Sequence, residues 1–375
     1  MKNIIVLFGG KSCEHDISVI TGVLTVNSIN AELFNVIPIY ITNNGVWYTG
    51  NALKDISFYK TKNLKLLTNV TLTVGSDILY SVKKNKLKKI SKIDCAVNCC
   101  HGKIGEDGNL YGVINASGIG MVGSPCFSSA LSMDKEYTKI VLSGLKVDKL
   151  QCFTVKKDSF YLDRNLALNN AEENIGFPMI VKPCNLGSSI GIKVVTNKEE
   201  LTEGLIKAFK YDGKVIIEKY LSEFREINCA CYSVGGKVVV SECEEPTVKN
   251  QILSFKDKYQ SGSVEMGVDK KFPADIPKKV SDKIKNTTKT VYEKCGFSGI
   301  IRVDYLLSND KIYLNEINSI PGSMAYYLFT DTLKGFSNIL TELILDAMIV
   351  KRAENSLDYT YFSKVLSLDG VKTHK

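Results

Sequence analysis

The chain has 375 residues, which at roughly 100–200 residues per domain is enough for two or three domains with buried cores. Hydrophobic residues make up 44% and charged residues 23%, a composition that excludes wholesale disorder. No apolar run reaches the roughly 18–20 residues that a membrane-spanning helix needs. The apolar stretch Ile4 to Phe8 is too short for a signal peptide, so we expect a cytoplasmic protein.

Eleven cysteines and a net charge of +8 are the other notable features of the composition. The cysteines form no CxxC pair, which favours reduced, buried thiols over a zinc site or a redox motif. Part of the positive charge lies in one stretch that contains Lys83, Lys84, Lys86, Lys88, Lys89 and Lys92. No aromatic residue lies among these lysines, so we favour a solvated loop or sheet edge over a nucleic-acid or membrane patch.

In chain order, the first predicted elements are strand 4–8, helix 17–29, strand 36–41 and strand 94–100. The order strand–helix–strand indicates a parallel sheet. Small molecules bind at the carboxyl ends of the strands in such sheets, where the Gly9-Gly10 turn and His101 lie. We therefore expect a ligand near these two places.

The elements predicted after these are helix 128–145, strand 178–182, strand 192–195, helix 198–209, strand 215–218, strand 227–234, strand 237–243, helix 277–295, strand 299–307, strand 311–317 and helix 336–351. Within this part of the chain, residues 245–275 are polar and show no regular pattern, which predicts a long loop. The tail after residue 351 is expected to be mobile.

The last two predicted strands, which turn at residues 308–310, carry the strongest chemical signal. Strand periodicity places Arg302 and Asp304 on one face, and Glu316 and Asn318 on one face of the partner strand. Two carboxylates and an amide oxygen suit Mg²⁺, which needs few protein ligands when phosphates complete its shell. The pattern leaves open the alternative of an Arg–Glu pair on a solvated face.

Residues Gly187 to Gly191 form a glycine- and serine-rich loop between two predicted strands, which indicates a hairpin. Glycine lets backbone N–H groups close on an anion, and the two serine hydroxyls add donors. Lys182 lies just before this loop and offers a point charge for a phosphate. An ordinary turn is the alternative, because the Walker sequence GxxxxGK[ST] is absent.

His101 begins the segment His101–Gly108, HGKIGEDG, directly after a predicted strand. It is one of only three histidines and precedes a glycine-rich turn, which makes it a candidate site residue. A purely structural histidine is the alternative.

These segments belong to a longer series of short motifs, which are Gly9–Glu14, His101–Gly108, Ser129–Lys135, Val181–Pro183, Gly187–Gly191, Ile217–Lys219, Lys258–Tyr259, Arg302–Asp304 and Asn315–Gly322. In content and order the series resembles the D-alanine–D-alanine ligases of the ATP-grasp superfamily, over roughly residues 1–345. The most specific pieces are HGxxGEDG and NExNxxPG, whereas the Gly-Gly turn alone is not specific.

The resemblance implies an α/β protein with the three-domain ATP-grasp architecture. Residues 1–125 would form a Rossmann-like substrate domain with a parallel sheet. Two α+β domains, residues 126–223 and 224–350, would hold ATP between them as the central and the C-terminal catalytic domain. Residues 351–375 would be a tail.

The resemblance also implies the cofactor contacts, residue by residue. The matching positions are Lys135 and Lys182 for the phosphates, Ser188, Ser189 and the loop amides closing over them, Lys258 of a mobile loop, Glu218, Lys219 and Leu221 at the adenine, and Glu226 at the ribose. Asp304, Glu316 and Asn318 would bind two Mg²⁺ ions, for which Mn²⁺ could substitute.

The implied reaction activates a carboxylate by phosphorylation, after which an amine attacks the acyl phosphate. Glu14 would face the ammonium group of the first D-alanine, and His101 would lie near its carboxylate. Arg302 and the Gly322 N–H would stabilise the tetrahedral oxyanion. Lys258 and Tyr259 would belong to the loop that closes the site and excludes water, with Tyr259 hydrogen-bonded to Ser188 and Glu14.

The expected function is therefore ATP-dependent ligation of two D-alanines for peptidoglycan synthesis. Two segments depart from the family pattern: Tyr327 lies near the position where the family usually has a serine for the acceptor carboxylate, and the residues before Lys258 differ. A D-alanine–D-serine ligase or another D-alanine–D-X ligase is thus an alternative, as is an ATP-grasp ligase with a donor other than alanine. A non-catalytic ATP-binding module is an alternative of another class.

The expected partners are small molecules alone, namely ATP, D-alanine and a second D-amino acid. We expect no nucleic-acid or membrane partner. Family members are commonly homodimers, so the resemblance implies a homodimer here.

Overall fold

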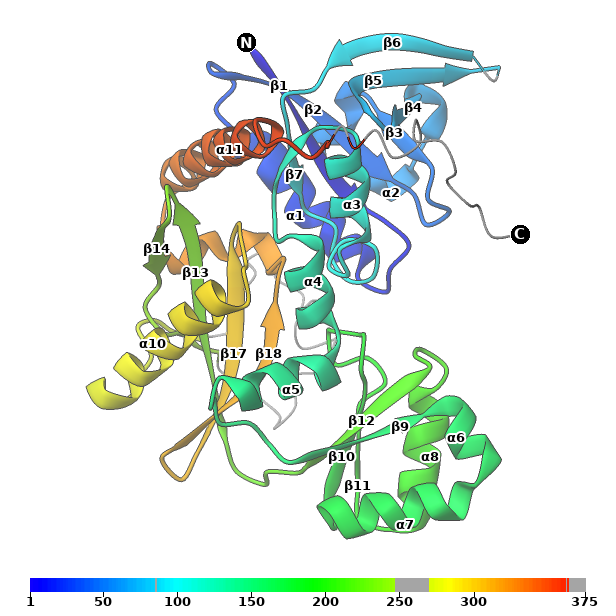
Figure 1. The fold of residues 1–375 in the computed structure, drawn as a ribbon, viewed down its shortest axis with the longest axis vertical. Helices are drawn as coiled ribbons and strands as arrows, with labels where there is room; N and C mark the ends of the chain where they lie inside the picture. Colours follow the sequence, from blue (N-terminus) through cyan, green and yellow to red (C-terminus); the bar gives the residue numbers. More distant parts are fainter. Residues whose placement is uncertain (85, 247–269, 362, 364–375) are drawn as a thin grey trace.

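The computed structural model describes residues 1–84, 86–246, 270–361 and 363. Three sheets follow one another along the long axis of the molecule (Figure 1). The N-terminal sheet lies at one end and the sheet of residues 152–219 at the other, with the sheet of residues 225–318 between them.

The N-terminal sheet has eight strands in the order β6-β5-β4-β3-β2-β1-β7-β8. Its parallel half consists of β1 (Lys2–Gly9), β2 (Phe34–Ile41), β7 (Cys95–Asn98) and β8 (Gly120–Val122). Its antiparallel half adds β3 (Trp47–Thr49), β4 (Thr68–Thr73), β5 (Ser76–Lys83) and β6 (Lys86–Lys92). The parallel part is as expected, whereas the antiparallel extension was not predicted, because its strands are half-buried or exposed and lack a long apolar run.

Short helices and one long helix accompany this sheet. They are α1 (His15–Ser28), α2 (Phe58–Thr61) and α3 (Asn109–Ala116), with 3₁₀ turns at Asn51–Lys54 and Leu64–Leu66. Helix α1 packs closely on β1, since a Cβ atom at Gly22 would lie 2.2 Å from the ring of Phe8. The turn before α1 requires glycine too, because Gly9 has a φ of +92° and a Cβ atom there would lie 2.3 Å from the carbonyl oxygen of Ile41. This tight turn delivers Glu14 to the carboxyl end of β1.

The sheet of residues 152–219 is antiparallel, in the order β11-β10-β12-β9. Its strands are β9 (Cys152–Lys156), β10 (Met179–Pro183), β11 (Lys193–Val195) and β12 (Lys214–Lys219), and its helices are α6 (Lys157–Leu162), α7 (Arg164–Ile175) and α8 (Lys198–Ala208). Leu168, Leu201 and Leu205 of α7 and α8 pack with Val181 and Val215 in one core. Strands β10 and β11 pair in antiparallel register, so the predicted hairpin around residues 187–191 is present.

The third sheet has the order β14-β13-β17-β18 and is also antiparallel. It consists of β13 (Arg225–Val234), β14 (Lys237–Val240), β17 (Ile301–Ser308) and β18 (Lys311–Asn318), and a separate pair is formed by β15 (Glu245–Pro246) and β16 (Lys270–Lys271). Helix α10 (Lys278–Lys294) covers one face, where Ile284 and Val291 pack with Val303 and Tyr305. The opposite face carries Arg302 and Asp304.

After β18 a 3₁₀ segment, Gly322–Leu328, leads to helix α11 (Leu333–Asn355). Helix α11 returns to the N-terminal sheet, where a Cβ atom on Gly120 would lie 2.7 Å from the carbonyl oxygen of Ala347 (Figure 1). Phe336, Leu340 and Ile344 of this helix share the core of β1 and α1. The N-terminal sheet is thus joined to the last helix by a common core.

The single helix predicted over residues 128–145 is wrong. Two helices, α4 (Cys126–Met133) and α5 (Lys135–Gly144), meet at Asp134, whose backbone is extended. The Asp134 carboxylate accepts hydrogen bonds from the N–H groups of Glu136 and Tyr137, and therefore caps the N-terminus of α5. The apolar pattern of the sequence continues from α4 into α5, so the pattern gave no sign of the cap between them.

The lysines of residues 83–92 lie on β6, the outermost strand of the N-terminal sheet, and at its turn from β5. Almost every residue of β6 is exposed, which agrees with the solvated sheet edge expected from the sequence. None of the helices that the structure describes has both the length and the apolar character needed to cross a bilayer.

Candidate functional site

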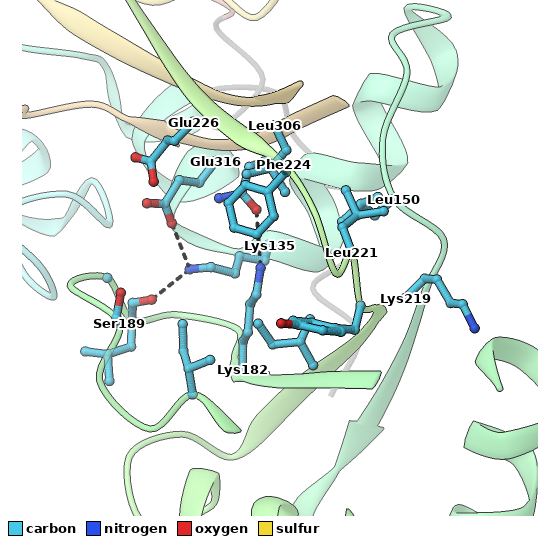
Figure 2. A pocket seen from close by; sticks show the side chains of 16 residues that line it. Lys135, Leu150, Lys182, Ser189, Lys219, Leu221, Phe224, Glu226, Leu306 and Glu316 are labelled. Carbon is cyan, nitrogen blue, oxygen red and sulfur yellow. Dashed lines mark hydrogen bonds and ion pairs between the residues drawn. The ribbon is translucent and has the colours of Figure 1, made fainter. Parts of the chain in front are cut away.

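A cleft of about 760 Å³, open solvent at its mouth included, lies between the sheet of residues 152–219 and the sheet of residues 225–318 (Figure 2). The predicted site residues among those lining it are Lys135, Lys182, Ser189, Lys219, Leu221, Glu226 and Glu316. Apolar and aromatic side chains complete the walls, namely Leu150, Ile180, Leu186, Ile192, Tyr220, Phe224 and Leu306. The cleft is therefore lined by charged side chains of both signs and by apolar side chains.

Lys182 is held in the cleft by a buried carboxylate behind it. Its Nζ lies 2.6 Å from Oε2 of Glu218 and donates a hydrogen bond to Oδ1 of Asn315 at 3.2 Å. The other oxygen of Glu218 lies 2.8 Å from Nζ of Lys139, and neither Lys139 nor Glu218 exceeds 2% side-chain exposure. Burial opposes ionisation of Glu218, but the two ammonium groups outweigh it and lower the pKa of Glu218 to about 2.

Lys135 approaches the cleft from the first turn of α5, the position that the Asp134 cap fixes. Its ammonium group donates to the carbonyl oxygen of Leu186 at 2.7 Å and lies 3.8 Å from Oε2 of Glu316 (Figure 2). Lys135 thus connects the hairpin loop to the acidic strand pair. With Lys182 it gives the cleft two ammonium groups at the same wall.

The hairpin loop closes the cleft on the side of the N-terminal sheet. Ser188 and Ser189 both have left-handed backbones, with φ of +55° and +57°. The Ser188 hydroxyl donates to Oε1 of Glu14, the residue directly before α1, whereas Ser189 lines the cleft. The short loop after β10 is therefore bonded to the N-terminal domain through one buried carboxylate.

The residues expected at the adenine and the ribose do not all point into the cleft. Leu221 and Glu226 line it, and Figure 2 shows the side chain of Lys219 pointing away from its centre. The ammonium group of Lys219 donates to the carbonyl oxygens of Gly176 and Phe177, at 3.3 and 3.4 Å. The Glu218 carboxylate lies behind the wall, on the two lysines described above.

The pair β17–β18 brings the predicted metal ligands together. Asp304 lies opposite Glu316, and Arg302 lies opposite Asn318. Both oxygens of Asp304 accept from the Arg302 guanidinium, at 2.7 and 2.9 Å, and Nδ2 of Asn318 donates to Asp304 at 3.0 Å. The alternative of a solvated Arg–Glu pair is wrong, because the partner of Arg302 is Asp304 on its own strand, and Asp304 is only 1% exposed.

A neighbouring polar atom supports a cation at this place. Asn228 on β13 lies directly opposite Asp304, so its side chain is on the same face of the sheet. Its side-chain oxygen is buried and has no hydrogen-bond partner within the described residues. A buried oxygen without a donor is costly unless a ligand satisfies it. Two carboxylates and amide oxygens are a hard-oxygen donor set that fits Mg²⁺.

His101 and Gly322 lie beside this strand pair. His101 is buried, and its Nε2 lies 2.9 Å from the hydroxyl oxygen of Thr21 on α1. Burial and the nearby Arg302 guanidinium lower the pKa of His101 to about 4, so the imidazole is neutral at pH 7. Gly322 follows Pro321 and begins the 3₁₀ segment, in which Ser323 donates its N–H to the same Thr21 oxygen at 3.1 Å.

Glu106 connects these pieces, although the sequence assigned it no role of its own. Its carboxylate accepts from the N–H of Gly102 at 2.8 Å and from the N–H of Ile320 at 3.1 Å. Burial, and then the nearby Glu14 carboxylate, raise the pKa of Glu106 to about 8. Through these two hydrogen bonds, Glu106 joins the residues just before Gly322 to the turn after His101.

Tyr327 lies near Arg302, and Lys270 Nζ is 3.8 Å from the centre of the Tyr327 ring. Lys270 also pairs with the buried Glu244 at 3.3 Å. Lys258 and Tyr259, the predicted residues of the closing loop, lie outside the described residues. Lys139, Glu106, Asn228 and Thr21 are the residues of this region that motif reasoning did not single out.

Comparison with known proteins shows which family of sequences this chain matches. A family model described as "D-ala D-ala ligase N-terminus" matches residues 3–124, and one described as "D-ala D-ala ligase C-terminus" matches residues 141–346. A protein of Thermosipho melanesiensis named D-alanine--D-alanine ligase is 37% identical over 355 residues, which cover 92% of this chain and 93% of that protein. A protein of the same name from Thermosipho africanus is 36% identical over 379 residues, 98% of this chain and 99% of that protein.

Solved structures are similar over the same length. The D-alanine-D-alanine ligase of Helicobacter pylori has a TM-score of 0.74 and 28% identity, covering 92% of this chain and 98% of that one. The VanG D-Ala:D-Ser ligase of Enterococcus faecalis has a TM-score of 0.76 and 30% identity, covering 92% and 99%.

Proposed function

The chain belongs to the D-alanine–D-alanine ligase family, and we propose that it joins two D-alanines at the expense of ATP, through an acyl phosphate, to supply peptidoglycan synthesis. One observation supports this most strongly. Lys135 and Lys182 meet the acidic β17–β18 pair at one cleft, and Glu14 of another domain reaches that cleft through Ser188. Such a site can bind a triphosphate beside an amino acid.

In this proposal, Lys135 and Lys182 bind the phosphates of ATP, with Ser188, Ser189 and the loop amides around them. The adenine lies against Leu221 at the segment that Glu218 and Lys219 begin, and Glu226 accepts hydrogen bonds from the ribose. Glu218 acts mainly by holding Lys182, to which it is bonded at 2.6 Å. Lys258 adds a further charge at the phosphates.

Asp304, Glu316 and Asn318 would hold two Mg²⁺ ions, for which Mn²⁺ could substitute. The Asn318 nitrogen already donates to Asp304, so the amide oxygen is the atom that it would offer to a cation. Bound Mg²⁺ would neutralise charge on the phosphoryl group during its transfer. Among the described residues, no group of three or more His, Cys, Asp or Glu side chains could hold a metal ion by itself. Phosphates would therefore have to complete the coordination of Mg²⁺.

The chain's own residues would then position the amino acids and stabilise charge. Glu14 attracts the ammonium group of the first D-alanine, and neutral His101 donates a hydrogen bond to its carboxylate. Arg302, held by both oxygens of Asp304, and the N–H of Gly322 stabilise the oxyanion that forms when the second amine attacks. Lys258 and Tyr259 close the site, because an acyl phosphate would otherwise hydrolyse.

D-Serine is the competing acceptor. Tyr327 lies near Arg302, where the acceptor has to bring its amine to the acyl carbon beside the oxyanion donors. A tyrosine at this place changes the volume and the hydrogen bonding that the second amino acid meets. D-Alanine is the acceptor we propose, since the two Thermosipho relatives carry the name D-alanine--D-alanine ligase.

Three further parts of the proposal concern organisation. We propose a cytoplasmic homodimer, with no nucleic-acid or membrane partner. The domains would comprise residues 1–125, 126–223 and 224–350, followed by a tail, so that each domain contains one of the three sheets described above. Sedimentation at several protein concentrations tests the dimer.

The function is tested by mass spectrometry of the products formed from ATP, Mg²⁺, D-alanine and competing D-amino acids. We expect ADP, phosphate and D-alanyl-D-alanine in equal amounts from D-alanine alone. A dipeptide formed only when D-serine is added would identify the serine-specific alternative. No ADP with any D-amino acid would favour the non-catalytic ATP-binding module.

A further inference from the structure

Thr21, in the middle of α1, lies between two segments of the site that are far apart in the sequence. Its hydroxyl oxygen is 2.9 Å from Nε2 of His101 and accepts the N–H of Ser323 at 3.1 Å. Thr21 is 1% exposed, so water does not replace either contact. One buried hydroxyl therefore joins the histidine after β7 to the segment after β18.

The two contacts determine where the hydroxyl proton goes. The N–H of Ser323 can only donate, so it occupies a lone pair of the Thr21 oxygen. A hydroxyl has a single proton, and among the described residues Nε2 of His101 is the one other group hydrogen-bonded to this hydroxyl, which it can accept from in one of its two tautomers. If the Thr21 hydroxyl donates its hydrogen bond to Nε2, then the Ser323 N–H, the Thr21 hydroxyl and Nε2 of His101 all have a partner.

The charge state of His101 makes this assignment consistent. Burial and the Arg302 guanidinium keep the imidazole neutral, and a neutral imidazole has one donor nitrogen and one acceptor nitrogen. When Nε2 accepts from Thr21, the ring proton lies on Nδ1. A substrate carboxylate can only accept hydrogen bonds, so an N–H group is the form in which His101 can bind it.

We propose that Thr21 is a positioning residue that sets the tautomer of His101, by donating its hydroxyl proton to Nε2 and leaving the Nδ1–H group to bind the carboxylate of the first D-alanine. The last step rests on the proposed function. The N–H of Ser323 contributes, because it fixes the orientation of the hydroxyl. Ser323 begins three consecutive left-handed residues, so its N–H direction is set by an uncommon backbone turn.

The tautomer can be measured directly in the complete protein with ¹⁵N-labelled histidine. Only three histidines occur in the chain, and a His101→Asn variant assigns the signal of interest. We expect His101 in the wild type to show a protonated Nδ1 and an unprotonated Nε2 at pH 7. A proton on Nε2 would overturn the proposal without any variant being made.

Three variants test the cause. Thr21→Val keeps the shape but removes the hydroxyl, and should redistribute the His101 ring between both tautomers. Thr21→Ser should restore the wild-type spectrum. Thr25→Val is the matched control, because Thr25 is buried one turn further along α1 and its hydroxyl bonds the carbonyl of Thr21, not His101. An unchanged tautomer in Thr21→Val would contradict the proposal.

Kinetics separate this proposal from the function on which it rests. We expect Thr21→Val to raise the KM for the donor D-alanine roughly tenfold, with a smaller change in the KM for ATP, as for the loss of one hydrogen bond to a charged group. A shifted tautomer with an unchanged D-alanine KM would overturn the role in substrate binding. If the wild type forms no ADP with D-alanine, the proposed function fails, whereas the spectrum still decides the Thr21–His101 bond.

Discussion

Lys139 and Glu218 form an ion pair of 2.8 Å at a depth where neither side chain is more than 2% exposed. The second oxygen of Glu218 binds Lys182, the ammonium group that faces the cleft. A single carboxylate thus serves two lysines, and only one of them can reach a ligand. Lys139 has a structural role, because it keeps Glu218 charged and oriented. Glu218 in turn holds Lys182 in position.

Replacing Lys139 with Met should lower the free energy of unfolding by about 3 kcal/mol, because the change leaves part of a buried carboxylate unpaired. The matched control is Lys198→Met, which removes an exposed ion pair of the same length, 2.8 Å to Glu172, and should cost less than about 1 kcal/mol. Urea unfolding of both variants measures the difference. Equal losses would show that the buried pair has no special importance.

The stability of the wild type should depend on acid through Glu218. Its pKa is about 2 in the folded protein, below the ordinary 4.5, so the folded state binds this proton less readily than the unfolded state does. The contribution, roughly 3 kcal/mol by linkage, is complete above pH 4.5 and is lost as the pH falls toward 2. Between pH 5 and 2.5, the free energy of unfolding should therefore fall more steeply with decreasing pH for the wild type than for Glu218→Gln. Parallel curves would refute the assignment.

Glu316→Gln should reduce the rate of ADP formation by more than about a hundredfold, since it removes a charged ligand from a proposed Mg²⁺ site. Asp304→Asn should behave alike. Glu223→Gln is the control, because that carboxylate lies outside the cleft. Near-normal turnover of Glu316→Gln at saturating Mg²⁺ would show that this side chain does not hold the cation.

Tyr327→Phe should change the ratio of kcat/KM for D-alanine and D-serine as acceptors. Burial raises the pKa of Tyr327 to about 12, so the hydroxyl stays protonated and can donate at neutral pH. Tyr326→Phe is the control, because the Tyr326 ring stacks on Phe336 with the ring centroids 4.7 Å apart. If Tyr327→Phe leaves the ratio unchanged, the residue lies outside the acceptor pocket.

Changing Lys86, Lys88 and Lys89 together to Gln should leave turnover unaltered and increase self-association. These residues lie on the exposed edge strand β6, where positive charge discourages pairing with another sheet edge. Light scattering and the rate of ADP formation check the two halves of this expectation. A large loss of turnover would assign the lysines a role in the reaction.

The parts of the fold that the sequence predicted well are those buried on both faces. Strand 4–8 and helix 17–29 correspond to β1 and α1, since continuous apolar runs and a glycine turn leave few alternatives. Strands β3 to β6 escaped prediction because half-buried and exposed strands have no long apolar run. The break at Asp134 escaped because a cap needs only one polar residue within an otherwise helical pattern.

The site was predicted where residues act within one motif, and missed where they act across segments. Arg302, Asp304, Glu316 and Asn318 share two adjacent strands, so alternation alone places them together. Lys139 offered one usable signal, a lysine on the buried face of an amphipathic helix. Thr21 offered none, because its partners lie 80 and 302 residues away in the chain.

The central claim, that a carboxylate is activated by phosphorylation in this cleft, is tested most directly with D-alanine labelled with ¹⁸O in its carboxylate. One oxygen of the donor should attack the γ-phosphorus, become the bridging atom of the acyl phosphate and leave with phosphate when the amine attacks. Mass spectrometry should then find one ¹⁸O atom in each phosphate released. Phosphate without the label, formed while dipeptide accumulates, would contradict the account.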